Sequence, residues 1–531
     1  MKEIYIIGGG LGGLFAGALQ AKKGRKVTVL EKNDTPGGGL QTFTRKVGER
    51  CEIFETGMHL LGGFREDGAV RILLKKLQIF DKLKIKSVDS NCMDEIIYLS
   101  DRKVYRIPEG KDNFIAYFQH EFPHEAKGIK LYVEKLWSIV DEISFFFLRE
   151  ENDKIYSHDE MFYWPADKVI SHYIKDAKLQ DILAYMNPMF GGRAGHTPCY
   201  VSALINRLYI SGVDRFVGGS HQLTKLLTGV IEDAGGKVLL MHEVNCIETD
   251  DKKRRITAIK GKEKRKYDFE FKLDDTDMVV CDVAPKKLID MTATHLFTKA
   301  FRARVSSAPA SYSTFCLFII LKEKSFPYIN HTCYMQRSYG KVWRYGEYND
   351  EEWPNGFMYL TPCVENQADW AHTMVVNAPM PYSTCIKWED TKVGNRGDEY
   401  IKWKKKITNK ILDRMEDIYP GFRDKCLKIY SSSPLTIRDY LGNPEGGMYG
   451  TEVDCQNLMQ RQMPIHTKIS NLLMTGQNVY LHGSCGVPLT ALQTSNALDY
   501  YMEYLKPRLR YSLNWKYPSL SFRIDASSKR G

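Results

Sequence analysis

Two short apolar runs with a helical pattern between them open the chain. Ile4 to Ile7 form the first run and Val27 to Leu30 the second, and both have the length and composition of buried strands. Between them, Leu14, Ala18 and Ala21 recur at the spacing of one helix face. The pattern predicts a strand-helix-strand unit, which is typical of an α/β fold with a parallel sheet.

The turn between the first strand and the helix is rich in glycine. Gly8, Gly10 and Gly13 fit the G-x-G-x-x-G pattern, and Gly12 lies inside it. Such glycines allow a tight turn, close approach of a pyrophosphate to the backbone and close packing of the helix on the strand. Glu31, at the end of the second strand, is placed to bind ribose hydroxyls and to repel a 2′-phosphate. The unit therefore predicts a site for an unphosphorylated dinucleotide such as FAD or NAD.

Residues from about 75 to 210 show helical spacing and many aromatic side chains, and strand-like runs follow in the later segments. Helical spacing is clearest over 129–148, whose apolar face we interpret as core, or as a lipid contact at its aromatic end 145–147. The basic stretches 252–255 and 260–266 are interpreted as solvated hairpin turns. Strand-like runs are predicted over 237–241, 243–247, 256–259, 267–273 and 278–281, and over 312–321, 343–348, 357–360 and 373–378. The aromatic second group fits either the wall of an apolar ligand site or a sheet core.

Further glycine-rich segments follow the opening unit. Residues 36–42 and 54–63 indicate backbone pressed against a planar or extended ligand, or else ordinary tight turns. Near the other end, 471–478 leads through 483–488 into a helix. The positive end of that helix would stabilise the negative charge of a reduced flavin.

The composition narrows the class of protein. A chain of 531 residues exceeds one compact core, so two or three lobes are expected. The 75 Lys and Arg against 65 Asp and Glu give a net charge of +10, but the basic residues form no nucleic-acid motif, so we predict no nucleic-acid partner. The twelve cysteines show no C-x-x-C pair and no His cluster at zinc-like spacing, which predicts no metal site and a reduced, cytoplasmic setting.

Membrane contact is predicted at most at the surface. No apolar run reaches the roughly eighteen residues that a spanning helix needs. The strand that starts at residue 4 leaves no room for a signal peptide before it. The basic and aromatic tail over 506–531 is interpreted as a disordered end or as a contact with anionic lipid. The predicted localisation is thus cytoplasmic, with membrane association as an alternative.

Together these segments resemble the phytoene desaturase-like flavoproteins, which include carotenoid desaturases, carotenoid isomerases and retinol saturase. The resemblance extends over the full length and is carried by 8–13 with Glu31, 36–42, 54–63, 217–247, 280–285 and 474–496. The segments 475–478 and 483–486 are most similar to the retinol saturase branch. These blocks are specific to the family but not to a substrate.

The resemblance implies an α/β fold with a discontinuous domain. A Rossmann-type FAD-binding domain is expected over three segments, with an inserted α+β substrate domain between them and a basic tail behind them. The expected ranges are 1–75, 215–300 and 435–505 for the FAD-binding domain, 76–214 and 301–434 for the substrate lobe, and 506–531 for the tail.

The resemblance also implies cofactor-binding residues beyond the opening turn. Val244 matches the family position whose backbone pairs with the adenine, and Gly476 matches a position along the ribityl chain. Where the wider superfamily often has an acid, this chain has Gln477, whose amide can still bind a ribityl hydroxyl. The expected FAD contacts are Lys32, Gly38, Gly39, Gln41, Val244, Gly476, Gln477 and Val487.

The activity implied by the resemblance is that of an FAD-dependent oxidoreductase on carbon–carbon double bonds of an apolar isoprenoid. It would be a retinol saturase-like reductase or a carotenoid desaturase or isomerase. Because only one dinucleotide fingerprint is present, a separate electron donor or acceptor is expected. The alternatives are an amine oxidase-like flavoenzyme and a non-catalytic lipid-binding escort protein of the same fold.

Candidates for a proton donor come from the polar residues of the glycine-rich turns. His59, Tyr449 and Cys485 are the catalytic candidates, and His482 and His196 are further ones. Each of them has an ordinary structural role as its alternative. The spacing shows no triad and no paired carboxylates.

Overall fold

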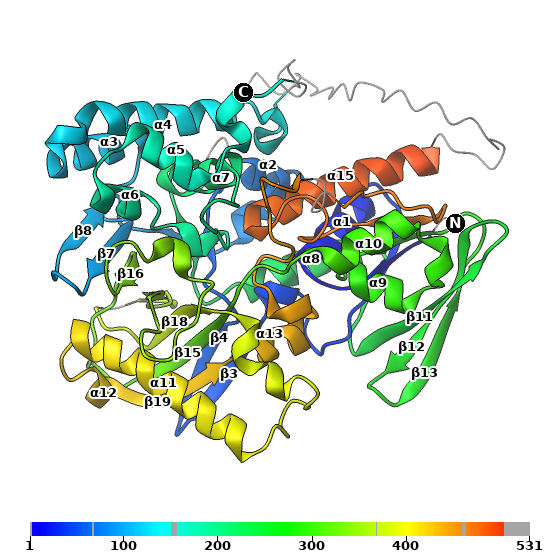
Figure 1. Cartoon of the computed structure of the whole chain (residues 1–531). Helices are drawn as coiled ribbons and strands as arrows, with labels where there is room; N and C mark the ends of the chain where they lie inside the picture. The colour runs from blue at the N-terminus through cyan, green and yellow to red at the C-terminus, as the bar shows by residue number, and fades with distance from the viewer. Residues whose placement is uncertain (1–2, 66–67, 150–156, 368, 459–462, 504–531) are drawn as a thin grey trace.

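The computed structural model describes residues 3–65, 68–149, 157–367, 369–458 and 463–503 (Figure 1). Within them the chain forms two large sheets, one of five strands and one of seven, and helices pack against both. The predicted basic tail lies outside the described residues.

The five-stranded sheet is parallel throughout, and its strands come from three separate parts of the chain. In spatial order they are β10 (Lys237–Leu239), β2 (Lys26–Leu30), β1 (Glu3–Ile7), β14 (Met278–Cys281) and β20 (Leu472–Met474). Alternation along β1 sends Ile4 and Ile6 into one apolar core and Tyr5 and Ile7 into another. The sheet is thus covered on both faces, as expected of a parallel sheet.

Helices cover one face of this sheet, and a small antiparallel sheet covers the other (Figure 1). The helices are α1 (Leu11–Ala21), α8 (His221–Asp233) and α15 (Gly483–Glu503). Gln20 on α1 donates a hydrogen bond to the Ser495 carbonyl at 2.9 Å, so the first and last described helices are joined. The small sheet contains β11 (His242–Asp250), β12 (Arg255–Glu263) and β13 (Tyr267–Lys272), with α9 (Pro285–Met291) and α10 (Lys299–Ser307) beside it.

The basic stretch predicted as a turn over 260–266 is largely strand. Lys260 lies within β12 and pairs with Glu248 at 2.7 Å and with Glu270 at 3.4 Å on the two flanking strands. The turn itself is confined to 264–266. Acidic residues on the neighbouring strands stabilise an exposed strand that is rich in lysine. The sequence pattern alone does not show which residues face each other across strands.

The seven-stranded sheet is mostly antiparallel. In spatial order its strands are β19 (Cys426–Ser432), β15 (Ser313–Leu321), β18 (Thr373–Met380), β17 (Gly356–Leu360), β16 (Thr332–Gln336), β7 (Asp94–Tyr98) and β8 (Val104–Ile107). The pair β16 and β7 is parallel. Helix α11 (Asp398–Ile418) covers one face with Ile407, Ile411 and Met415, while Tyr334 and Met358 face the core on the other side.

The strand predicted over 343–348 is wrong. A 3₁₀ turn, Val342–Arg344, stands there between β16 and β17. Val342 and Tyr345 are the fully buried residues, and their spacing of three is that of a helical turn, whereas a strand would alternate. The high aromatic content of the segment produced the mistaken prediction.

Several helices form a group above the seven-stranded sheet (Figure 1). They are α3 (Lys111–Glu121), α4 (Ala126–Asp141), α5 (Ala166–Tyr173), α6 (Ala177–Leu183) and α7 (Cys199–Ile210), while α2 (Ala69–Lys76) lies beside α15. The helix predicted over 129–148 is shorter than expected, because α4 ends at Asp141 and a 3₁₀ turn, Ser144–Phe147, follows. Leu148 closes that turn with a positive φ of 53°, and Phe146 is buried, so this aromatic residue belongs to the core.

Smaller elements connect these layers. They are β3 (Thr42–Val47), β4 (Arg50–Glu55), β5 (Leu60–Leu61), β6 (Ile85–Ser87), β9 (Asp214–Phe216), α12 (Phe422–Lys425) and α13 (Pro434–Leu441). Among the described residues, no helix is both long and apolar enough to cross a bilayer.

Candidate cofactor and active site

One cavity of about 580 Å³ lies at the carboxyl ends of β1, β2, β14 and β20. The turns that follow these strands line one end of it, and apolar side chains of α7 and its neighbours line the other. Ligands of parallel α/β sheets bind at this edge. The volume is typical of a site for a small molecule or cofactor.

The opening glycine turn borders the cavity as predicted. Gly8, Gly10 and Gly12 line it, and Gly8 takes a φ of +101°, which residues with side chains rarely adopt. Gly13 is not among the lining residues but lies under the turn, where an added Cβ would stand 2.1 Å from the Gly8 carbonyl oxygen. Gly10 caps α1 without a side chain, so the start of the helix can receive phosphate oxygens.

Glu31 and Lys32 lie at the adenosine side of the opening turn. The Glu31 carboxylate lines the cavity and accepts hydrogen bonds from the backbone N–H groups of Gly9 and Asn33, both at 2.8 Å. Burial raises its pKa. The Lys32 ammonium also lines the cavity and donates to the Asp439 carbonyl at 2.9 Å, and burial lowers its pKa.

Asp282 is a residue of the site that the sequence reasoning missed. Its carboxylate accepts a hydrogen bond from Gly13 N–H at 2.8 Å. A Cβ added to Gly10 would lie 2.6 Å from Asp282 Oδ2. A Cβ added to Gly12 would lie 2.5 Å from Oδ1 of the same carboxylate, and one added to Gly476 would lie 2.2 Å from it. One acid therefore explains why three positions around it, Gly10, Gly12 and Gly476, are glycine.

The environment of Asp282 also changes its chemistry. Burial raises the pKa of its carboxyl group to about 7. A protonated carboxyl beside the glycine turn would leave the negative charge of a pyrophosphate unopposed. The signal for this residue was present in the sequence, because Asp282 directly follows the buried strand β14 and strand ends carry the ligands of such sheets.

The second glycine turn packs against the first. Gly37 N–H donates to the Gly9 carbonyl at 2.7 Å, and an added Cβ on Gly38 would lie 3.2 Å from Gly10 Cα. Gly38 and Gly39 line the cavity, as predicted. Gln41 does not line it, because its side-chain amide donates to the Thr35 carbonyl at 2.5 Å and holds the turn from behind.

The remaining predicted cofactor contacts come from β11 and from the segment between β20 and α15. Val244, Gln477 and Val487 line the cavity. Gly476 is not a lining residue, since it takes a φ of +91° and packs against Asp282. Val487 lies in the first turn of α15, so the start of this helix faces the cavity as the sequence predicted.

Four of the five proton-donor candidates surround this cavity. His59, Tyr449, His482 and Cys485 all line it. His196 lies elsewhere, with its Nδ1 3.0 Å from Asp454 Oδ2, and lines a different cavity. The structure thus groups the first four and separates the last.

The hydrogen bonds of these residues differ. His59 Nε2 lies 2.8 Å from the Gly39 carbonyl oxygen, and its Nδ1 lies 3.1 Å from Glu55 Oε1. Tyr449 donates its O–H to the Pro188 carbonyl at 2.9 Å. Burial raises the pKa of Tyr449 and raises that of the Cys485 thiol to about 12, which keeps both protonated.

The far end of the cavity is an apolar arm. Aliphatic and aromatic side chains form it, and the lining residues include Met58, Leu60, Phe146, Met189, Tyr200, Val201, Leu204, Ile205, Leu208 and Tyr209. Several of them lie on α7, at the helical spacing of one face. Sequence reasoning missed this arm because the same apolar spacing also describes an ordinary core helix.

Comparisons with known proteins agree with this geometry. A family model described as an NAD(P)-binding Rossmann-like domain matches residues 6–77. The chain is 24% identical over 532 residues to all-trans-retinol 13,14-reductase of Danio rerio, covering 93% of this chain and 86% of that protein. It is 24% identical over 469 residues to prolycopene isomerase 2 of an Oncidium hybrid cultivar, and this match covers 84% of this chain and 75% of that protein. Together, the matched domain and these relatives support a place for the chain in a phytoene desaturase-like family.

Solved structures extend the comparison to the fold. A variant of putrescine oxidase aligns with a TM-score of 0.60 at 13% identity, over 94% of this chain and 98% of that one. This chain and this neighbour share a Rossmann-like α/β fold. The matched domain indicates a site for a dinucleotide-type cofactor in this chain.

Proposed function

We propose that the protein is an FAD-dependent oxidoreductase or isomerase that acts on carbon–carbon double bonds of a long apolar isoprenoid such as a retinoid or carotenoid. The observation that carries the proposal is that one cavity joins the three glycine-rich turns to the apolar arm. The two relatives, named as a retinol reductase and a prolycopene isomerase, support the same class of reaction.

FAD fits the residues of this cavity. The turn from Gly8 to Gly12 would hold the pyrophosphate, Glu31 the ribose and Val244 the adenine. The segment from Gln477 to Val487 would lie along the flavin, with the positive end of α15 toward its ring. The corresponding domain division is proposed as 1–75, 215–300 and 435–505 for FAD, and 76–214 with 301–434 for the substrate.

Bound flavin supplies hydride chemistry to the reaction. The chain's own contribution is to orient an apolar substrate and to exclude water. The arm offers apolar contacts from Val201, Leu204 and Leu208, all on α7. His59 is proposed to hold a proton near the flavin end, because its Nδ1 faces the Glu55 carboxylate at 3.1 Å, whereas Tyr449 donates its O–H to a carbonyl. Electrons would come from or go to a separate carrier.

An amine oxidase-like activity fits the lining less well. An amine cation gains most from a nearby carboxylate in an enclosed site. Among the described residues that line the cavity, the acids are Glu31, Glu243 and Asp282, and all three belong to the nucleotide end. The escort alternative fits less well too, since the glycine turns retain the geometry that a pyrophosphate needs.

Anaerobic photoreduction of the purified protein tests the proposal. Retinoids, carotenoids, unsaturated fatty acids and amines are added in turn, and flavin absorbance and product isomers are followed. We expect an added retinoid or carotenoid either to reoxidise the reduced flavin or to be converted into another of its own isomers. A colourless protein that releases no flavin on denaturation would contradict the enzyme function, and reduction of the oxidised flavin by an amine would favour the alternative.

A variant pair locates the substrate. Val201→Trp fills the arm and should suppress turnover of the long substrate while the flavin spectrum stays unchanged. Ile72→Trp makes a similar change at a position that is 41% exposed on α2 and should leave both unchanged. Equal turnover in the two variants would show that the substrate does not use the arm.

Peripheral membrane contact is part of the same proposal. Tyr480 lines the cavity and is 44% exposed, and Tyr163 and Trp164 are also exposed. The Tyr163 ring packs edge-on against Tyr200, another lining residue, with centroids 6.1 Å apart. Exposed aromatic residues beside an apolar site suit the membrane interface.

Flotation with anionic vesicles tests that contact. The double variant Tyr163→Ser, Trp164→Ser should lose vesicle binding, whereas Tyr267→Ser on the β12–β13 hairpin should keep it. A full-length protein that stays wholly in the soluble fraction would disprove membrane contact.

A further inference from the structure

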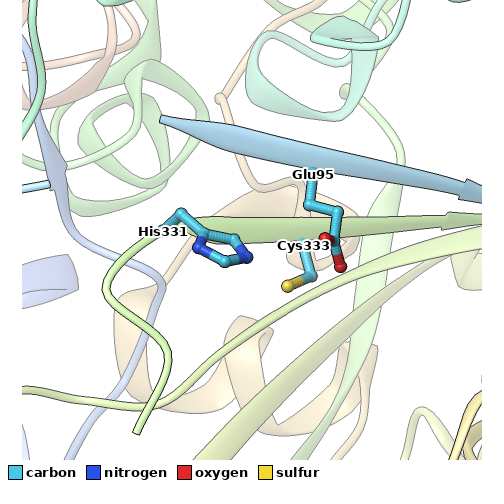
Figure 2. Close-up of side chains that lie close together, drawn as sticks. All are labelled: Glu95, His331 and Cys333. Atoms are coloured by element: carbon cyan, nitrogen blue, oxygen red, sulfur yellow. The ribbon is translucent and has the colours of Figure 1, made fainter. Parts of the chain in front are cut away.

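Three side chains of metal-ligand type lie together on the seven-stranded sheet (Figure 2). Glu95 belongs to β7, Cys333 belongs to β16, and His331 stands just before β16. Their ligand atoms all lie within 4.8 Å of one another. None of the three lies among the described residues that line the cofactor cavity.

Strand geometry explains why these residues meet. In the parallel pair of β7 and β16, Cys333 is the direct partner of Glu95. Side chains at i and i+2 share one face of a strand, so His331 lies on the same face as Cys333. Figure 2 shows the three side chains pointing toward one another from the two adjacent strands.

The chemical set suits a borderline-soft divalent cation. Zinc accepts thiolate, imidazole and carboxylate ligands at roughly 2.0–2.3 Å in a tetrahedral arrangement. The ligand atoms of a tetrahedral site with bonds of that length are about 3.5 Å apart. Side-chain rotations that move the ligand atoms by about 1 Å would therefore bring the present cluster around an ion. Three protein ligands leave a fourth position for water.

The neighbours of the cluster engage one carboxylate oxygen of Glu95. Glu95 accepts a hydrogen bond from Arg106 Nε at 3.0 Å through one carboxylate oxygen, Oε2. Arg215 is also near the cluster, and its guanidinium donates a hydrogen bond to the Ile329 carbonyl oxygen at 3.4 Å.

Cys333 is the group that an ion would change most. It is fully buried. A bound cation would stabilise the thiolate and release a proton.

We propose that Glu95, His331 and Cys333 bind one zinc-class divalent cation that joins β7 to β16. These two strands come from distant parts of the chain, so the ion would hold together the two insertions that form the substrate lobe. The site is separate from the cofactor cavity, so the ion would take no part in the flavin chemistry.

Metal content and cobalt substitution test the proposal on the full-length protein with its flavin. The protein is treated with a chelator, dialysed and titrated with Co²⁺ while the near-ultraviolet region is followed for thiolate-to-cobalt charge transfer. We expect one equivalent of Co²⁺ and a charge-transfer band in the unmodified protein, and one equivalent of zinc by elemental analysis before chelation.

Variants assign the band to the cluster. Cys333→Ser should abolish it, and His331→Gln should weaken Co²⁺ binding at least about tenfold, the lower limit found even for residues that only support a metal ligand. Cys426→Ser removes another thiol of the same sheet, on β19 and away from the residues that line the cofactor cavity, and should leave the band unchanged. Flavin content shows that each variant is folded.

Two results would overturn the proposal. One is an unmodified protein that gives no thiolate band at saturating Co²⁺. The other is a band that survives in folded His331→Gln with unchanged affinity, a result that stays informative even if Cys333→Ser fails to fold.

Discussion

The five-stranded and seven-stranded sheets place their polar groups by different rules. In the parallel sheet, the residues of the site follow directly after strands, and Glu31 and Asp282 meet at one edge because all strands run the same way. In the mixed sheet, neighbours are set by register, and Glu95 meets Cys333 because β7 pairs with β16. A parallel sheet therefore gathers chemistry at strand ends, whereas a mixed sheet gathers it across strands.

Both sheets bury an acid, and the partners differ. Asp282 accepts its hydrogen bond from the backbone of Gly13, at 2.8 Å. Asp94, in β7, accepts from the Tyr185 hydroxyl, also at 2.8 Å. Burial raises the pKa of each carboxyl to about 7. The contrast is thus in how the acids are positioned, and it can be tested in each sheet separately.

The largest effect is expected from Gly10→Val. An added Cβ there would stand 2.6 Å from Asp282 Oδ2, and the branched side chain would enter the space proposed for the pyrophosphate. Flavin content, measured after denaturation, should fall by roughly tenfold or more, which corresponds to about 1.4 kcal/mol or more of lost binding.

The control for this change is Gly229→Ala on α8, where an added Cβ meets no atom within 4 Å. It should retain full flavin. A Gly10→Val protein with normal flavin absorbance would show that the nucleotide is placed wrongly.

The next effect concerns pH. The pKa of Asp282 rises from 3.8 when unfolded to about 7 when folded, so between these values the folded state holds the extra proton. The contribution of this carboxyl to the free energy of unfolding is therefore full below about pH 4, and it is lost as the pH rises through about 7. Asp282→Asn should remove this loss and be more stable than the unmodified protein at pH 8, by about 1–3 kcal/mol.

Asp94→Asn makes the same comparison in the other sheet. The pKa shift of Asp94 has the same sign, so this variant should also flatten the pH profile of the unfolding free energy. If the two sheets are independent, the effects add in the double variant. Denaturant unfolding between pH 4 and pH 8 measures this, and steeper profiles in the variants would contradict the assignment.

A smaller effect is expected from His59→Ala. The ring supports the second glycine turn through the Gly39 carbonyl at 2.8 Å and faces Glu55 at 3.1 Å. Losing one such hydrogen bond costs about 1 kcal/mol, so flavin should bind about fivefold more weakly. His196→Ala, in the other cavity, serves as the control and should bind flavin normally.

The smallest effect is expected from Tyr449→Phe. Its hydroxyl donates to the Pro188 carbonyl, so its loss should lower the free energy of unfolding by about 1 kcal/mol. Turnover should stay within about twofold, because a change in barrier of less than half a kcal/mol is expected. A large loss of turnover with unchanged stability would identify Tyr449 as the proton donor instead.

Local patterns in the sequence predicted much of the parallel sheet. Ile4 to Ile7 and Gly8 to Gly13 carry their own signal, because an apolar run and a glycine turn need no distant partner to be recognised. The strand predicted over 343–348 was wrong because the buried residues there are three positions apart, whereas the buried residues of a strand alternate with exposed ones. The helix over 129–148 was predicted too long because apolar spacing continues past the residue at which α4 ends.

The rest of the site depends on contacts that no local pattern contains. The role of Asp282 follows from glycines in two other turns, and the apolar arm follows from which face of α7 borders a cavity. The cluster of Glu95, His331 and Cys333 depends on a strand pairing between residues far apart in the chain.

The contact between α1 and α15 has a consequence for the newly made chain. The first helix completes its packing only against the last described helix, through pairs such as Gln20 with Ser495. The edge strand β20 also lies far along the chain from β1. On the ribosome, where the N-terminal part emerges first, the opening strand-helix-strand unit must wait for β20 and α15 to emerge before its sheet is complete. The cofactor is therefore expected to bind only after α15 has been synthesised, in a step that flavin supply can limit.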